Sequence, residues 1–209
     1  MWKVNQLLFA DDTVLVAESE EDLQKLVTEF ERVCTRRKLK VNVAKSKVMR
    51  STRANDRAET RISMNGEQLE EVDSFKYLGS HVTKAGTVDE EVKYRVKEAS
   101  KCMGGMKSVM SNRALGMSAK RRLYEGVVVP TAVYGAETWN MKEADRRRLD
   151  VFEMRCLRSM VGVSRLDRVR NEEVRRRAGV ERKLSEKVDQ RVLGWYGYVC
   201  VGMGFIFFI

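Results

Sequence analysis

The sequence contains one histidine and four scattered cysteines, and these shortages exclude several kinds of chemistry. Because His81 is the only histidine among 209 residues, nucleophilic catalysis that relies on a histidine base is not expected. No two cysteines have the spacing of a metal-binding or redox motif; they are Cys34, Cys102, Cys156 and Cys200. A zinc site of the usual Cys/His kinds is therefore not expected. The cysteines fit an intracellular location, nucleus or cytoplasm, as small core residues.

The amino end lacks the apolar run of a signal peptide, since residues 2–6 read WKVNQ. Residues 192–209 contain no charged residue and approach the length of a membrane span, but four glycines interrupt them. We expect a buried final helix to about residue 199, followed by an unrelated apolar tail over residues 200–209. A membrane anchor is the less favoured alternative.

Acidic residues are fewer than basic ones, with 30 Asp and Glu against 40 Lys and Arg, a formal net charge of +10. The excess lies in the second part of the chain, because residues 1–87 carry a net charge of +1 and residues 88–209 a net charge of +9. This distribution suggests a polyanionic partner, such as an RNA or DNA backbone. A solvated basic surface would give the same composition.

The hydropathy pattern predicts an α+β fold, in which strands and one helix come first and only helices follow. In the first part we expect strands at residues 6–9, 13–16 and 75–82, extended pieces at 41–43 and 47–49, a hairpin at Asn65-Gly66, and a helix over 20–36. In the second part we expect helices over residues 88–110 with a weak point at Gly104-Gly105, from Ser118 onward with a break at Pro130, and over 143–160, 171–178 and 185–199. We therefore expect two domains, residues 1–87 and 88–199, and a tail at 200–209.

Two adjacent carboxylates, Asp11 and Asp12, lie at the predicted turn between the first two strands. Carboxylates placed in this way commonly bind a divalent metal ion against phosphate groups. Aspartate is also a common turn residue, so the pair alone leaves a purely structural role open.

Several ordered motifs resemble those of non-LTR (LINE-type) retrotransposon reverse transcriptases. The run LLFADDTVLVA at residues 7–17 is similar to the catalytic palm hairpin, LKVNVAKSK at 39–47 to the next palm motif, and FKYLG at 75–79 to the hairpin that grips the primer end. Further similarities to the helical region of the family are YGAETW at 134–139, RCLR at 155–158 and DRVRNEE at 167–173. The resemblance extends over residues 5–199.

The resemblance implies RNA-templated DNA synthesis by the back half of a palm followed by a helical, thumb-like region. It implies that Asp11 and Asp12 hold Mg²⁺ and that Lys45 lies near the incoming phosphates. It also implies a primer-positioning role for a second group, Phe75, Tyr77, Leu78 and Gly79. Lys45 can equally be an ordinary member of a basic run, and the second group can be a plain buried strand.

The chain also departs from the family pattern. The first palm motif with its essential aspartate would precede Met1, and the fingers and the nucleotide-selecting motif have no counterpart in these residues. The segment WYGYV at 195–199 lacks the histidine that the family prefers. We therefore expect no independent polymerase activity. Three fates remain open: an inert remnant, a retained nucleic-acid-binding module, or a subunit completed by a second chain that supplies fingers and front palm.

Three basic triplets in the helical region are the expected contacts to an RNA or DNA backbone. They are Lys120, Arg121 and Arg122; Arg146, Arg147 and Arg148; and Arg175, Arg176 and Arg177. Each triplet spans nearly one helical turn, so only one or two of its charges can face a single groove. Alternatively, these side chains pair along their own helices with Glu143, Asp145, Glu172 and Glu173.

Overall fold

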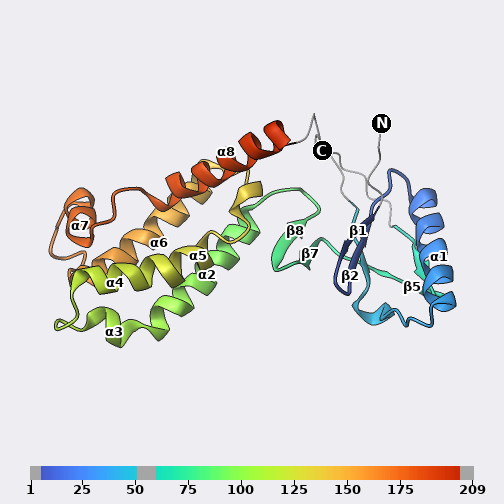
Figure 1. Ribbon diagram of the computed structural model, residues 1–209, viewed down its shortest axis with the longest axis horizontal. Helices are drawn as coiled ribbons and strands as arrows, with labels where there is room; N and C mark the ends of the chain where they lie inside the picture. The colour runs from blue at the N-terminus through green and yellow to red at the C-terminus, as the bar shows by residue number, and fades with distance from the viewer. Residues whose placement is uncertain (1–5, 51–59, 203–209) are drawn as a thin grey trace. The chain divides into compact units, whose positions relative to one another are not determined.

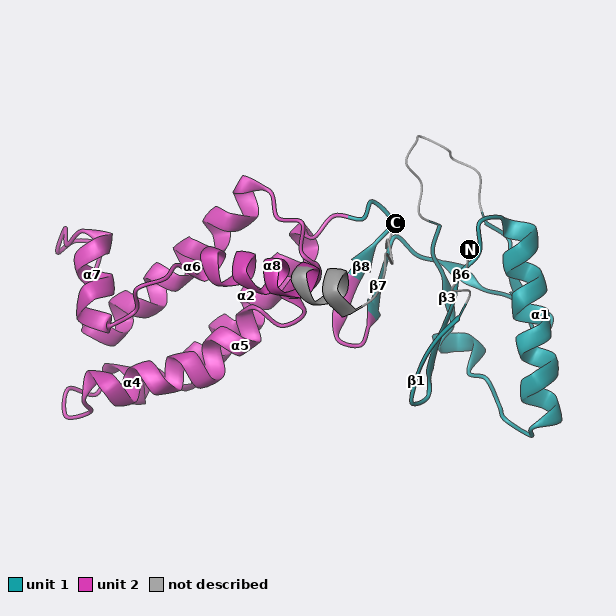
Figure 2. Cartoon of the chain, turned by 45° about the horizontal axis from the view of Figure 1, so that its top comes forward, with its two compact units in different colours: residues 1–76, 82–86 teal, residues 77–81, 87–209 magenta. Residues whose placement is uncertain are grey.

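The computed structural model describes residues 6–50 and 60–202, with side chains described up to residue 196 (Figure 1). The chain divides into two compact units (Figure 2): unit 1 comprises residues 1–76 and 82–86, and unit 2 comprises residues 77–81 and 87–209. Unit 1 combines short strands with one long helix, whereas unit 2 is mainly helical. This is the mixed α+β class expected from the sequence.

Unit 1 begins with a tight β-hairpin followed by a long helix. β1 (Gln6–Phe9) pairs antiparallel with β2 (Asp12–Leu15). Helix α1 (Glu20–Arg36) begins after Ser19, whose hydroxyl oxygen accepts a hydrogen bond from the Asp22 amide at 3.1 Å. This cap satisfies one of the free amides of the first turn, where three acidic residues also favour the positive end of the helix dipole.

The rest of unit 1 is built from very short elements: η1 (Val43–Lys45), β3 (Lys47–Val48), β4 (Ser63–Met64), β5 (Glu67–Gln68) and β6 (Glu70–Glu71). β4 and β5 form the expected hairpin, and Asn65 and Gly66 adopt positive φ values of 52° and 79° in its turn. β3 and β6 pair in parallel. The small core beneath α1 consists of Val27, Val48, Ile62, Met64 and Leu69, with Leu15, Leu23 and Phe30 packed against it.

Two expectations for this part of the chain are wrong. Val43 lies in the 3₁₀ turn η1 rather than in an extended piece, because the Asn42 side chain accepts from the Lys45 amide and favours a turn. Residues 75–82 form two paired strands, β7 (Ser74–Tyr77) and β8 (Ser80–Thr83), rather than one. The chain reverses at Leu78 and Gly79, whose φ values are 46° and 85°. The expected loop at residues 51–60 lies almost wholly outside the described residues.

Unit 2 is an array of helices: α2 (Asp89–Gly105), α3 (Lys107–Ser111), α4 (Met117–Leu123), the π-helical turn η2 (Tyr124–Val128), α5 (Val129–Ala132), η3 (Ala136–Thr138), α6 (Glu143–Val161), α7 (Asn171–Ala178) and α8 (Leu184–Gly202). The helix expected over 88–110 ends at Gly105 and resumes at Lys107, at the predicted weak point. The break expected at Pro130 takes the form of the π-helical turn η2 just before it, and the backbone stays helical from α4 through η2 into α5.

Helix α6 lies at the centre of unit 2 and packs against α2, α7 and α8. Its Leu149, Leu157 and Met160 are fully buried, together with Tyr124 and Val128 from the π-helical turn. Within residues 6–202, none of the helices combines the length and apolar character that a membrane span requires. Residues 203–209 of the expected tail lie outside the described residues.

Candidate active site and nucleic-acid interface

The acidic pair lies at the tip of the β1–β2 hairpin, as expected. Ala10 and Asp11 form the turn, and Asp12 is the first residue of β2, opposite Phe9. Ala10 has a φ of 52°, in the left-handed region that side chains other than glycine rarely adopt. Both aspartates are exposed, so their carboxylates are not desolvated in this unit.

The strand that leads to the tip is unusually apolar for an exposed segment. Leu8 is 67% exposed and Phe9 is 61% exposed. Exposed apolar side chains next to two carboxylates are costly to leave in water, and they are typical of a surface that another segment or molecule covers.

Carboxylate oxygens suit Mg²⁺, which is usually bound by one or two carboxylates together with water and substrate phosphates. Asp11 and Asp12 therefore fit as contributors to such a site. Among the described residues, however, no three Asp, Glu, His or Cys side chains come together in an arrangement that could hold a metal ion. Lys45 ends η1 with its side chain exposed, and within residues 6–50 and 60–196 no hydrogen bond or ion pair joins it to the acidic pair.

The turn of the β7–β8 hairpin is anchored within unit 2 by polar contacts to its backbone. The Arg95 guanidinium donates to the Gly79 carbonyl oxygen, and the Tyr134 hydroxyl donates to the Leu78 carbonyl oxygen at 3.2 Å. Arg95 also lies over the Tyr134 ring, 4.4 Å from its centroid, in a cation–π contact.

A buried carboxylate completes this anchor. Glu91 is 2% exposed and accepts from Arg95 Nε at 2.6 Å and from the His81 amide at 2.7 Å. The hairpin turn and the YGAETW segment, two motifs far apart in the sequence, therefore meet through Arg95. Of the four residues expected to position a primer, Leu78 and Gly79 take part in this network through their carbonyls, whereas Phe75 is exposed and takes no part.

Sequence reasoning missed Glu91 and Arg95. Their spacing of four residues on a helix is a weak signal, because it is typical of a solvent-exposed ion pair. In the folded unit the pair is buried and contacts His81, Gly79 and Tyr134, and the sequence pattern does not specify these contacts.

The basic triplets are largely engaged in contacts within unit 2. Lys120 is 5% exposed and donates to the Met160 carbonyl oxygen at 3.3 Å, and Arg121 donates to the Gly179 carbonyl oxygen at 3.1 Å. Both acceptors lie at the carboxyl ends of helices, α6 and α7, where a cation is favourable. Arg122 is exposed and has no partner among the described residues.

The second triplet is fully paired. Arg146 binds Asp189, Arg147 binds Glu143 at 3.2 Å, and Arg148 binds Asp145 at 3.0 Å.

The third triplet is also paired, and one of its members is structural. Arg175 pairs with Glu153, which is wholly buried and also accepts from the Tyr124 hydroxyl and the Leu184 amide. Arg176 and Arg177 both bind Glu173, and their hydrogen bonds lower the pKa of that carboxyl to about 2. Pairing with Glu143, Asp145 and Glu173 is the arrangement that the alternative interpretation expected. Contact of the triplets with nucleic acid stays a prediction.

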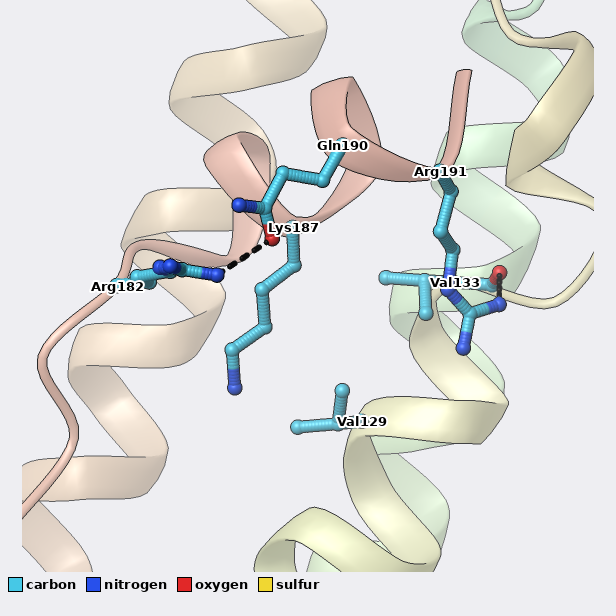
Figure 3. Close-up of a pocket in the computed structure, with 6 residues that line it drawn as sticks. All are labelled: Val129, Val133, Arg182, Lys187, Gln190 and Arg191. Atoms are coloured by element: carbon cyan, nitrogen blue, oxygen red, sulfur yellow. Dashed lines mark hydrogen bonds between the residues drawn. The ribbon is translucent and has the colours of Figure 1, made fainter. Parts of the chain in front are cut away.

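A cavity of about 380 Å³ opens beside α5 and α8 (Figure 3). Val129 and Val133 form its apolar part, and Arg182, Lys187, Gln190 and Arg191 form the rest. Arg182 donates to Gln190, and Arg191 donates to the Val133 carbonyl oxygen at 3.0 Å. None of the residues expected to be functional lines this cavity.

Comparisons with known proteins support a reverse transcriptase-related chain. Residues 1–82 match the family model of reverse transcriptase (RNA-dependent DNA polymerase). A transposon-derived protein of Caenorhabditis elegans is 26% identical over 201 residues, which correspond to 94% of this chain and 71% of that protein. No solved structure matches the chain. The matched residues 1–82 contain the acidic hairpin and end within β8, so the family model does not extend over the helices of unit 2.

Proposed function

We propose that the chain carries the back half of the palm and the thumb-like region of a non-LTR retrotransposon reverse transcriptase. The observation that carries the proposal is the exposed Asp11-Asp12 pair at a hairpin tip, within the segment that matches the reverse transcriptase family. The order of the other motifs supports the same assignment for residues beyond that segment.

In this proposal, Asp11 and Asp12 would hold Mg²⁺, and the bound ion would supply activation of the primer hydroxyl and charge neutralisation of the incoming triphosphate. The tight turn leaves both carboxylates exposed to solvent, where they would be accessible to a metal ion that also binds phosphate groups. The anchored turn at Leu78 and Gly79 positions the primer backbone in the family pattern. Arg95 and Tyr134 would act on it only as positioning residues, since they hold the turn through its carbonyl oxygens.

We further propose that these 209 residues do not polymerise by themselves. Catalysis of phosphoryl transfer depends on a preorganised set of charges around the reacting groups. The described residues place two carboxylates at the hairpin tip and bring no third ligand to them. Polymerisation would therefore need fingers and front-palm residues from a second chain or from sequence outside these residues.

Primer extension tests this proposal. The purified chain is incubated with an RNA template, an annealed DNA primer, Mg²⁺ and deoxynucleotides, beside an active reverse transcriptase as a positive control. The expected result is no extension. Extension that disappears in the double variant Asp11→Asn, Asp12→Asn would contradict the proposed dependence on added residues.

A second function, a nucleic-acid-binding module, is favoured by one specific observation. Unit 2 carries exposed arginines that have no acidic partner among the described residues, and three of them are neighbours in one loop: Arg165, Arg168 and Arg170. An unpaired arginine can bind a phosphate group without first breaking an ion pair within the protein.

A further inference from the structure

The loop between α6 and α7, residues 162–170, differs from the basic triplets in how its charges are used. Arg165, Arg168 and Arg170 are exposed, and within the described part of the chain none of their guanidinium groups has a hydrogen bond or an ion pair. Eight of the nine triplet side chains, by contrast, already contact carboxylates or carbonyl oxygens. The loop therefore brings together three arginines that are more available to an anionic partner than the side chains of the triplets.

The loop is held in one shape by two local networks. Arg158 donates to the carbonyl oxygens of Ser164 at 3.1 Å and Val169 at 2.7 Å, and to Asn171 Oδ1 at 3.0 Å. The Asp167 carboxylate accepts from the Ser164 amide at 2.6 Å and from the Ser164 hydroxyl at 2.9 Å.

These contacts engage Asp167, which is the only acidic residue of the loop, and Arg158 of α6. The Ser164 hydrogen bonds lower the pKa of Asp167, so this carboxylate is ionised but already occupied at neutral pH. Arg158 is used to fix the backbone. The three unpaired arginines are consequently displayed from a backbone that needs little ordering upon binding, which reduces the entropic cost of association.

Leu166 lies among these arginines and is 90% exposed. A single exposed leucine is ordinary, but this one lies between unpaired cations on a braced loop. Apolar side chains in such surroundings contact sugars and base edges or insert at base steps, while neighbouring cations bind the phosphates.

We propose that the α6–α7 loop docks a nucleic-acid backbone, with Arg165, Arg168 and Arg170 on phosphates and Leu166 against sugar or base. The proposal rests on the nucleic-acid-binding function proposed above and moves it from the basic triplets to this loop. A nucleic acid suits this loop because its backbone carries closely spaced phosphate charges, which neighbouring arginines can neutralise together.

The experiment compares two triple variants that remove the same charge from unit 2. The loop variant is Arg165→Ala, Arg168→Ala, Arg170→Ala. The matched control is Arg147→Ala, Arg176→Ala, Arg177→Ala, which removes three exposed arginines that are paired with Glu143 and Glu173. The probe is a labelled 20-base-pair RNA–DNA hybrid, affinity is measured by fluorescence anisotropy at about 0.1 M salt, and circular dichroism verifies folding.

Each lost phosphate contact on a duplex weakens binding by roughly eightfold at about 0.1 M salt, from counterion release. Two or three contacts in the loop therefore predict a loss of roughly 50- to 500-fold in the loop variant, and a much smaller loss, below roughly tenfold, in the control. Leu166→Ala, which keeps the charge, should weaken binding about fivefold through lost apolar contact.

The outcomes separate the loop proposal from the wider function. If the wild-type chain binds in a salt-sensitive way and the loop variant binds equally well, the loop proposal alone is overturned. The same holds if the control variant loses as much affinity as the loop variant. Absence of salt-sensitive binding by the wild-type chain would overturn the nucleic-acid-binding function together with it.

Discussion

The buried carboxylate of Glu153 provides a quantitative test of how unit 2 is held together. Glu153 is wholly buried on α6 and accepts hydrogen bonds from Tyr124 at 3.3 Å, from the Leu184 amide at 2.9 Å and from Arg175. Burial, together with the nearby carboxylate, raises the pKa of Tyr124 far above its ordinary value, so the phenol stays protonated and donates.

Replacing Glu153 by alanine removes the two carboxylate oxygens that accept these three hydrogen bonds. It also leaves Arg175, whose side chain is 13% exposed, without its counterion. Breaking one partner of a buried pair costs about 3–5 kcal/mol, because the remaining charge is uncompensated. The loss of the hydrogen bonds alone gives a similar destabilisation. Each hydrogen bond from the neutral donors Tyr124 and Leu184 contributes about 0.5–1.5 kcal/mol, and the one from the charged Arg175 contributes about 1.5–3 kcal/mol. We therefore expect Glu153→Ala to lower the free energy of unfolding by about 3–5 kcal/mol.

Glu143→Ala is the matched control, because Glu143 is also on α6 and also pairs with an arginine. The side chains of that pair are 69% and 77% exposed, so solvent screens it and the expected loss is below about 1 kcal/mol. Urea unfolding followed by the helical circular dichroism signal measures both variants. If Glu153→Ala does not fold, Glu153→Gln keeps one acceptor and should give a smaller, measurable loss. Equal losses in Glu153→Ala and Glu143→Ala would refute the reasoning.

Three further predictions follow from unit 1 and from the buried thiols. Burial raises the pKa of Cys156 to about 12, so at pH 8 its thiol should resist alkylation in the folded chain and react in urea. Peptide mass spectrometry locates the modification, and fast alkylation of Cys156 in the folded chain would contradict its burial. Ser19→Ala should lower the free energy of unfolding by about 1 kcal/mol through loss of the α1 cap, measured by urea unfolding, and no change would show that the cap is not formed. Mg²⁺ titration monitored by NMR should reveal binding on the order of millimolar that Asp11→Asn weakens; a micromolar site would contradict a two-carboxylate ligand set.

The parts of the fold that local sequence determines were predictable. The helix over 20–36 was predicted from Ser19 and its apolar face, and the hairpin at Asn65-Gly66 from two residues that tolerate positive φ. The tip position of Asp11 was predictable because turn residues separate two apolar runs.

The turn at Leu78-Gly79 was not predictable from the residue pattern, because leucine at a φ of 46° is rare. The alternating apolar residues on either side are equally typical of one continuous strand. Only the resemblance to the primer-gripping hairpin of reverse transcriptases pointed to a turn there.

Which basic side chains make buried contacts and which stay exposed could not be predicted either. Arg175, Arg176 and Arg177 are consecutive in the sequence, but tertiary packing brings only Arg175 to the buried Glu153. In the same way, Lys120 is buried because its ammonium group lies at the end of a helix 40 residues later in the chain. Contacts between distant segments decide these cases, and a single sequence does not specify them.

The claim that unit 2 binds a nucleic-acid backbone is tested most directly by the salt dependence of nucleic-acid binding by the wild-type chain. Binding of RNA–DNA hybrids of two unrelated sequences is measured by filter binding from low to high salt. Contact with about 3–5 phosphates of a duplex predicts a log–log slope of about −2.7 to −4.5 that is the same for both sequences, because phosphate contacts do not read bases. A slope near zero would contradict the claim, since it would leave the basic surface of unit 2 with no role beyond solvation.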